Sequence, residues 1–301
     1  MEDNSKLEVS FMTIVAVDRC LALVEALAAN PDGCFLAELA SGLDVPQSAV
    51  HRTLAMLMDR GYVRQDPASH AYLLTLRLAA MGFRFLEARH LPDAAQTVLD
   101  RLAQDCGEYC RLSLLEDARL TWVAWAQGAA QGLRYDPPMG RDIVLHATAT
   151  GKAWLATLPE ADALQLVYAQ GFPVPHGMNE RAFGGRLVRT IDELRAELTR
   201  TRERGYALAE EEGEPGIVAL AVCFRQDTAC DAPVLGTVSA AGPLLRLGPE
   251  RRPAIAERLH VARRELSTIW PIWKRQRAQR QPPEAGQANR QIAPVPTSAE
   301  S

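Results

Sequence analysis

The sequence predicts an α+β protein with a small N-terminal domain and a larger C-terminal domain that holds a mostly antiparallel sheet. Three observations support this prediction. Three segments before residue 61 have apolar residues at helical spacing, and two short strand-like runs follow them directly. A further helical segment, 75–90, leads into a longer region, about 93–270, where helical and strand-like stretches are interspersed.

The composition agrees with a folded protein of 301 residues, since 48% of them are hydrophobic and 23% are charged. No apolar run approaches the roughly 20 residues that span a bilayer. The first ten residues are polar and partly acidic, unlike a signal peptide. We therefore expect a cytoplasmic protein with no membrane partner.

The first domain is expected over 11–75 and begins with a helix at 16–29. The apolar positions of this helix recur at helical spacing and are expected to face inward: Val17, Leu21, Val24 and Ala28. A second helix is expected at 35–43, with its inward face formed by Leu36, Leu39, Ala40 and Leu43.

A third helix is expected to start at Pro46, which suits a first helical turn because its missing N–H would have no partner there. Val50, Leu54 and Leu57 would face inward, and Gly61 would end the helix. Residues 62–74 then have two strand-like runs around a turn that contains proline, which predicts a β-hairpin. This order of elements is that of a winged helix-turn-helix.

The outward face of the third helix suggests contact with DNA. Gln47, Ser48, His51 and Arg52 lie at neighbouring helical positions in its first turns. Arginine and glutamine side chains can read guanine and adenine in the major groove. A solvated polar face gives the same pattern. Wing residues that could bind phosphates favour DNA: Arg60, Arg64, Ser69 and His70.

The total charge gives no support to DNA binding, because the net charge is -4. Within 45–85, however, there are five arginines and only two aspartates, so this segment is basic. The DNA-binding prediction therefore depends on local placement of charge.

Beyond the first domain, a linker helix is expected over 76–91, where apolar residues at helical spacing suit packing against a partner subunit or within the chain. The second domain is expected over 92–270, with helices at 93–105, 149–157, 159–170, 190–204 and 250–269. Strands are expected at 110–116, 119–127, 206–210, 217–224 and 234–241.

Two features of the second domain's helices are specific. Thr190 and Glu193 have the spacing of a capping box. The last helix should bury Ile255, Leu259, Ala262 and Leu266. The tail, 274–301, is poor in large apolar residues and is expected to be disordered.

No catalytic set is evident in the second domain. Thr150-Gly151-Lys152 lacks the flanking residues of a phosphate-binding loop, and no nucleophile motif or metal motif is found. The six cysteines have no zinc-binding spacing and are expected to be free thiols. We expect no enzymatic activity, no cofactor and no metal.

Small residues cluster in 145–156 and 240–242, which suits either a ligand pocket or close packing of a helix on a sheet.

Several separated motifs, in this order, resemble the IclR family of transcription regulators. They are LAELASGLDVPQSAVHRTLAMLMDRGYV, MGRDIVLHATATGKAWLA, RERGYALAEEEGEPGIVALAV and the segment 239–243. The resemblance runs from about Val17 to Leu266. Where the family pattern has Ser-Thr in the recognition helix, this chain has Ser48-Ala49.

The resemblance implies a GAF-like effector-binding domain, a dimerising linker helix, and a homodimer or a dimer of dimers on near-palindromic operator DNA. It adds Ala49 to the DNA-binding candidates. It also implies that the following residues border the effector pocket: Ala147, Ala149, Thr150, Ile217, Ala219, Cys223, Ser239 and Ala241.

We therefore predict a repressor or activator, controlling a catabolic operon, that responds to a small organic acid or an aromatic metabolite. Two alternatives remain at the level of sequence. One is a winged-helix module that binds a partner protein, and the other is a metabolic enzyme with a winged-helix appendage.

Overall fold

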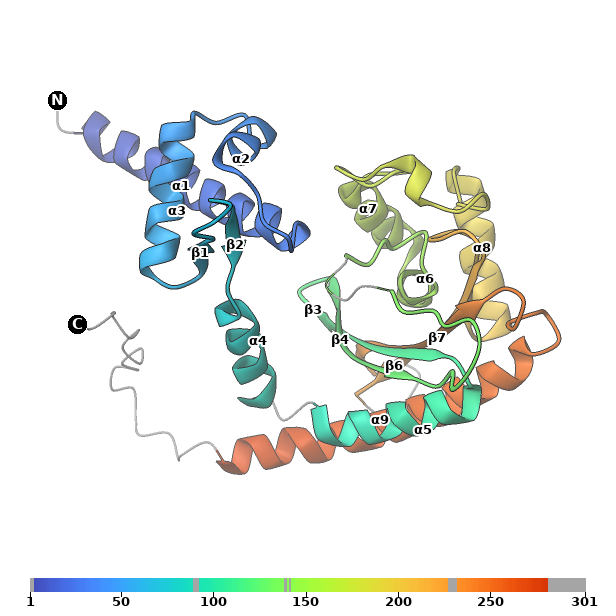
Figure 1. The fold of residues 1–301 in the computed structure, drawn as a ribbon. Helices are drawn as coiled ribbons and strands as arrows, with labels where there is room; N and C mark the ends of the chain where they lie inside the picture. Colours follow the sequence, from blue (N-terminus) through green and yellow to red (C-terminus); the bar gives the residue numbers. More distant parts are fainter. Residues whose placement is uncertain (1–2, 89–91, 138–139, 141, 227–231, 281–301) are drawn as a thin grey trace. The chain divides into compact units, whose positions relative to one another are not determined.

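The computed structural model describes residues 3–88, 92–137, 140, 142–226 and 232–280 of the chain (Figure 1). Side chains are described for the parts of these ranges that exclude 3–14, 86–88, 92–94 and 270–280. The described residues form two compact units, one ending at Ala88 and the other covering 92–280. We describe each unit by itself.

The N-terminal unit contains three helices, a β-hairpin and a fourth helix, as the sequence predicts. Its elements are α1 (Asp3–Ala29), α2 (Leu36–Gly42), α3 (Gln47–Asp59), β1 (Val63–Gln65), β2 (Tyr72–Leu74) and α4 (Arg77–Ala88). The two strands pair antiparallel, with Val63 opposite Leu74. The winged helix-turn-helix order is thereby confirmed.

The core of this unit is formed where α1, α2, α3 and the hairpin meet. It includes Leu23, Leu27, Leu39, Val50, Leu54, Leu57 and Val63. The predicted inward faces of α2 and α3 are confirmed. Gly61 ends α3 with a φ of +72°, a conformation that glycine adopts without strain.

Most of the predicted inward face of α1 is wrong: Val24 packs against the core, but Ala28 is exposed. Val17 and Leu21 are 55% and 57% exposed, whereas Leu23 and Leu27 are buried. The helix also begins at Asp3 and not at residue 16. Since apolar residues occur all round this helix, two overlapping stripes have helical spacing, and only packing against α3 and β2 selects one of them.

The C-terminal unit contains a five-stranded antiparallel sheet. Its strands are β3 (Tyr109–Glu116), β4 (Arg119–Gln127), β5 (Ala207–Glu210), β6 (Ile217–Arg225) and β7 (Val234–Pro243), in the order β4-β3-β7-β6-β5. Its helices are α5 (Pro92–Cys106), α6 (Ala149–Leu155), α7 (Glu160–Gln170), the short 3₁₀ helix η1 (Glu180–Ala182), α8 (Ile191–Arg204) and α9 (Arg252–Arg280).

Helices cover both faces of this sheet (Figure 1). α5 and α9 pack on one face and bury the predicted stripe of α9 there. On the other face, α6 packs against β5, β6 and β7, while α8 packs against α6 and β5. The capping box of Thr190 and Glu193 is present at the start of α8. The predicted α/β unit with an antiparallel sheet is confirmed.

The last helix is longer than the sequence predicts. It continues to Arg280, so residues 274–280 are helical and do not belong to a disordered tail. Arginine, glutamine and alanine in this stretch are good helix formers, and the next prolines occur only at 282 and 283. The remainder of the predicted tail, 281–301, lies outside the described residues, as does Cys230.

Among the described residues, no helix has both the length and the apolar character that crossing a membrane requires.

Candidate functional site

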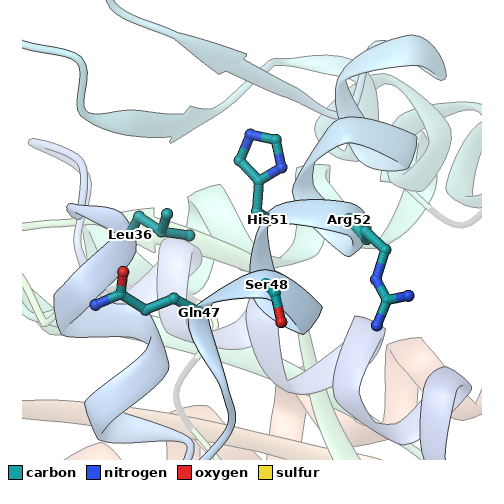
Figure 2. A pocket seen from close by; sticks show the side chains of 5 residues that line it. All are labelled: Leu36, Gln47, Ser48, His51 and Arg52. Atoms are coloured by element: carbon teal, nitrogen blue, oxygen red, sulfur yellow. The ribbon is translucent and has the colours of Figure 1, made fainter.

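The outer face of α3 is open to solvent. Gln47, Ser48, His51 and Arg52 are all exposed, and they line one open hollow together with Leu36 of α2. Figure 2 shows the four polar side chains projecting from the first two turns of α3, with Leu36 beside Gln47. None of these four side chains makes a hydrogen bond or an ion pair with the part of the chain that the structure describes. They are therefore free to meet another molecule.

Ala49 differs from the other DNA-binding candidates, because it is buried at 8% exposure. It packs on the inner side of α3, where Thr53 donates a hydrogen bond to its carbonyl oxygen. Its methyl group therefore has little surface to offer a partner.

The wing presents a basic and polar edge. The guanidinium of Arg64 in β1 is more than half exposed and lies 4.0 Å from the carboxylate of Asp66. Asp66 accepts hydrogen bonds from the backbone and the hydroxyl of Ser69, and these bonds lower the pKa of its carboxyl. The wing turn is thus held by its own side chains.

Two apolar side chains near this face, the half-buried Leu36 and the exposed Met56, were not expected from the sequence. Leu36 was placed on the inner side of α2 but also borders the hollow. Met56 lies one turn beyond Arg52 and is 65% exposed. The signal for Met56 was its helical position, four residues after Arg52.

A second candidate site lies on the sheet face that α6 covers. Strand register places side chains from neighbouring strands directly opposite one another on this face. Ala219 pairs with Ala241 and Ala221 with Ser239. The same face of β5 presents Ala207 and Ala209. This part of the sheet is therefore a floor of small side chains, on which Ala149 and Ala153 of α6 pack.

The structure brings together most of the predicted pocket residues around this floor. Ala147, Ala149, Thr150 and Ser239 are buried, with at most 4% exposure. Ile217, Ala219, Cys223 and Ala241 are half-buried. Removal from water raises the pKa of the Cys223 thiol to about 12, so this thiol stays protonated at neutral pH.

Larger polar and aromatic side chains continue the same face across β3 and β4. Tyr109 lies opposite Ala241, and Arg111 lies opposite Ser239. A register shift in the pairing of β3 with β4 turns both Trp122 and Trp125 towards this face, opposite Ser113 and Arg111. The sequence reasoning missed these residues, although the alternation of Tyr109, Arg111 and Ser113 was visible.

A buried ion cluster joins α6 to its neighbours through Lys152, Glu197 and Glu212. Lys152 is fully buried, and its ammonium lies 2.7 and 2.8 Å from the two carboxylate oxygens of Glu212 and 3.8 Å from Glu197. Burial raises the pKa of Glu212, and the Lys152 charge offsets only part of this effect. Burial opposes ionisation of Glu197 as well, but Lys152, Arg200 and Arg204 outweigh it and lower its pKa.

His146 precedes the predicted pocket segment and is fully buried. Its Nε2 lies 2.9 Å from the carbonyl oxygen of Pro173, which can only accept, so Nε2 carries the proton. Burial and the Lys152 charge lower the pKa of this imidazole, against the opposing effect of the Pro173 carbonyl.

We therefore expect the C-terminal unit to lose stability as the pH falls below about 6.5, because His146 protonates in the unfolded chain before it does in the folded one. The stability that neutral His146 contributes is fully present at pH values well above 6.5. It decreases by at most about 1.4 kcal/mol for each pH unit below that value. Denaturant unfolding between pH 7.5 and 5.5 measures it. The slope should be smaller in His146→Phe, and an equal slope in both proteins would show that His146 does not contribute.

Two family models together match most of the described chain. The model of the IclR helix-turn-helix domain matches residues 16–67, and that of the bacterial transcriptional regulator IclR C-terminal domain matches 83–268. The chain is 30% identical to the HTH-type transcriptional regulator BhcR of Paracoccus denitrificans, over 84% of this chain and 86% of that protein. It is 26% identical to the transcriptional repressor IclR of Escherichia coli, over 85% and 90% of the two chains.

Solved structures of similar fold include an IclR transcriptional regulator from Alicyclobacillus acidocaldarius. The TM-score between the two structures is 0.70, and the match covers 85% of this chain and 98% of that one at 23% identity. Another is an IclR homologue from Microbacterium hydrocarbonoxydans complexed with 4-hydroxybenzoate. Its TM-score is 0.68, and the match covers 85% and 99% of the chains at 19% identity. At these identities the likeness establishes the fold.

Proposed function

The chain belongs to the IclR family of bacterial transcription regulators. From this premise we propose that it binds operator DNA through α3 and the wing and is controlled by a small effector that binds beside α6, on the same face of the sheet. The observation that supports DNA binding most strongly is the open outer face of α3. Four polar side chains project from it and have no partners among the described residues.

In this proposal the first two turns of α3 enter the major groove. Arg52 hydrogen-bonds a guanine, Gln47 an adenine, and Ser48 or His51 a base or a phosphate. Arg64 on the wing contacts the phosphate backbone. Ala49 takes no direct part, because it is buried against the unit's own core.

The proposed assembly is a homodimer or a dimer of dimers that forms through α4. Phe83 of this helix is 71% exposed within the N-terminal unit. Arg77 and Met81 contact Tyr62 and so hold their own face of α4 against the hairpin, while Phe83, two residues after Met81, projects from the other side of the helix. A partner subunit on the side of Phe83 would place two α3 helices about one turn of DNA apart, roughly 34–36 Å.

The proposed effector is a small organic acid or an aromatic metabolite, and the regulated genes form a catabolic operon. The half-buried part of the small-residue floor, at Ala219 and Ala241, supports this effector proposal, because small side chains on partly exposed sheet surface leave space for a ligand. A structural neighbour of the same fold is complexed with 4-hydroxybenzoate, a molecule of this class. Regulation of this kind suits a cytoplasmic protein.

The test is fluorescence anisotropy with the full chain and a duplex from the DNA upstream of its own gene, against an unrelated duplex of equal length. We expect preference for the upstream duplex at 150 mM salt and a steep loss of affinity as salt increases, because phosphate contacts release counterions. Equal binding to both duplexes would contradict operator recognition. Binding of a protein partner that ignores salt would favour the interaction-module alternative.

A further inference from the structure

We propose that Arg111 binds the carboxylate of the effector, which makes the effector a small organic acid and Arg111 the residue that selects it. This inference rests on the proposed effector site and narrows its ligand to one chemical class. It concerns a β3 residue outside the small-residue floor and outside the candidates that the sequence suggested.

The position of Arg111 places it at the edge of the candidate pocket. It lies opposite Ser239 in the pairing of β3 with β7, and Ser239 in turn lies opposite Ala221 of the small-residue floor. All three side chains therefore share the sheet face that α6 covers. A ligand on the half-buried part of the floor, at Ala219 and Ala241, would lie beside Tyr109 and Arg111 of β3.

The charge of Arg111 is not neutralised by any carboxylate in the part of the chain that the structure describes. Its guanidinium lies 5.0 Å from the ring centre of Tyr109 and 4.8 Å from that of Trp122. Its Nη2 donates one hydrogen bond, 3.2 Å long, to the carbonyl oxygen of Pro137. Its Nε is buried without a partner, and no carboxylate pairs with Arg111 within the described ranges. Aromatic rings attract a cation, but they accept none of its in-plane hydrogen bonds.

The fully buried charges among the described residues of the C-terminal unit are paired, whereas the half-buried Arg111 has no carboxylate partner there. Lys152 has Glu212, and the fully buried Glu108 lies 2.6 Å from Arg246 and 3.4 Å from Arg251. Arg252, 9% exposed, lies 2.8 Å from Glu210. Arg111 is half-buried, and its Nε is buried without a partner. Because partial removal of a cation from water without a counter-ion is unfavourable, an anionic ligand would stabilise this site more than a neutral one would.

The surroundings of Arg111 suit a carboxylate on a small organic body. A guanidinium binds a carboxylate through two parallel hydrogen bonds, for which Nη1 is available because it has no partner in the described residues. The hydroxyl of Ser239 also has none there and can donate to the same anion. Tyr109 and Trp122 give an apolar wall for the remainder of the ligand.

The experiment compares acids with their uncharged amides on the full chain. Benzoate and benzamide, and propanoate and propanamide, are each titrated at constant ionic strength, with binding followed by thermal shift and by tryptophan fluorescence. We expect at least one acid to bind the wild type and to raise its Tm, and the matching amide to bind at least tenfold more weakly.

Variants assign the effect to the side chain. Arg111→Gln should weaken binding of the acid at least tenfold and abolish the preference over the amide, while Arg111→Lys should keep part of that preference. Arg119→Gln, on the exposed edge of β4, is the matched control and should bind as the wild type does. Circular dichroism and operator binding show whether each variant is folded. If Arg111→Gln is not, Arg111→Lys replaces it, and it should bind the acid more weakly than the wild type does while keeping part of the preference over the amide.

Two results would overturn the proposal. One is equal binding of acid and amide, or of acid to wild type and Arg111→Gln. The other is that no acid of the panel binds the wild type. If operator binding stays intact in either case, the assignment of Arg111 fails while the regulator function stands. If the wild type does not recognise the operator at all, the proposed function itself is contradicted.

Discussion

Replacement of Arg52 by alanine is expected to weaken binding to the specific operator by about 5- to 150-fold, which corresponds to about 1–3 kcal/mol. Arg52 is exposed in the second turn of α3 and has no ion pair among the described residues. Its side chain therefore has no such pair to break before it binds DNA. In the proposed complex, the lost contact is a bidentate hydrogen bond from Arg52 to guanine. Anisotropy with the operator and with single-base variants of it measures the loss.

Arg64→Ala on the wing is the matched control. A phosphate contact carries no sequence information, so this variant should weaken binding to all duplexes alike and reduce the dependence on salt. Arg52→Ala should instead reduce discrimination at one base pair of each half-site. Uniform weakening in both variants would show that Arg52 contacts only the backbone, and unchanged binding would show that it contacts no DNA.

Lys152→Met is expected to destabilise the C-terminal unit by about 3–5 kcal/mol. The substitution leaves the carboxylate of Glu212 buried with no counter-ion, and Glu197 loses one of its three cationic neighbours. Denaturant unfolding, followed by circular dichroism, measures the change. The N-terminal unit has its own core and should unfold as in the wild type.

A double variant identifies the origin of that loss. If the isolated buried carboxylate is the cause, Lys152→Met combined with Glu212→Leu should recover most of the stability, since replacing both partners by apolar groups removes the unpaired charge. Arg195→Ala breaks an exposed pair with Glu160 and should leave the unfolding curve unchanged. A loss in Lys152→Met as small as that of Arg195→Ala would contradict this account of the ion cluster.

The order of elements in the N-terminal unit could be predicted because local signals agree there. Val50, Leu54 and Leu57 have one possible inward face, and Gly61 marks the helix end. For α1 the sequence contains two apolar stripes, and local spacing cannot choose between them. Contacts with α3 and β2 decide the register, and these are not visible in the α1 segment itself.

The candidate effector site shows the same limit. Its small residues stood out as short runs, but the grouping of Arg111 with Ser239 depends on the pairing of β3 with β7, which are more than 100 residues apart in the sequence. The ion cluster of Lys152 also joins side chains from α6, α8 and the segment after β5. Only tertiary structure brings such residues together.

The most direct test of the central claim, that the outer face of α3 reads DNA, is selection by the full chain from a library of random duplexes at 150 mM salt. We expect an enriched near-palindromic motif with half-sites about one helical turn apart. With Arg52→Ala, the preference at one position of each half-site should be lost while the remainder of the motif persists. If the wild type enriches no motif, or if Arg52→Ala enriches the same motif with equal strength, the claim is contradicted.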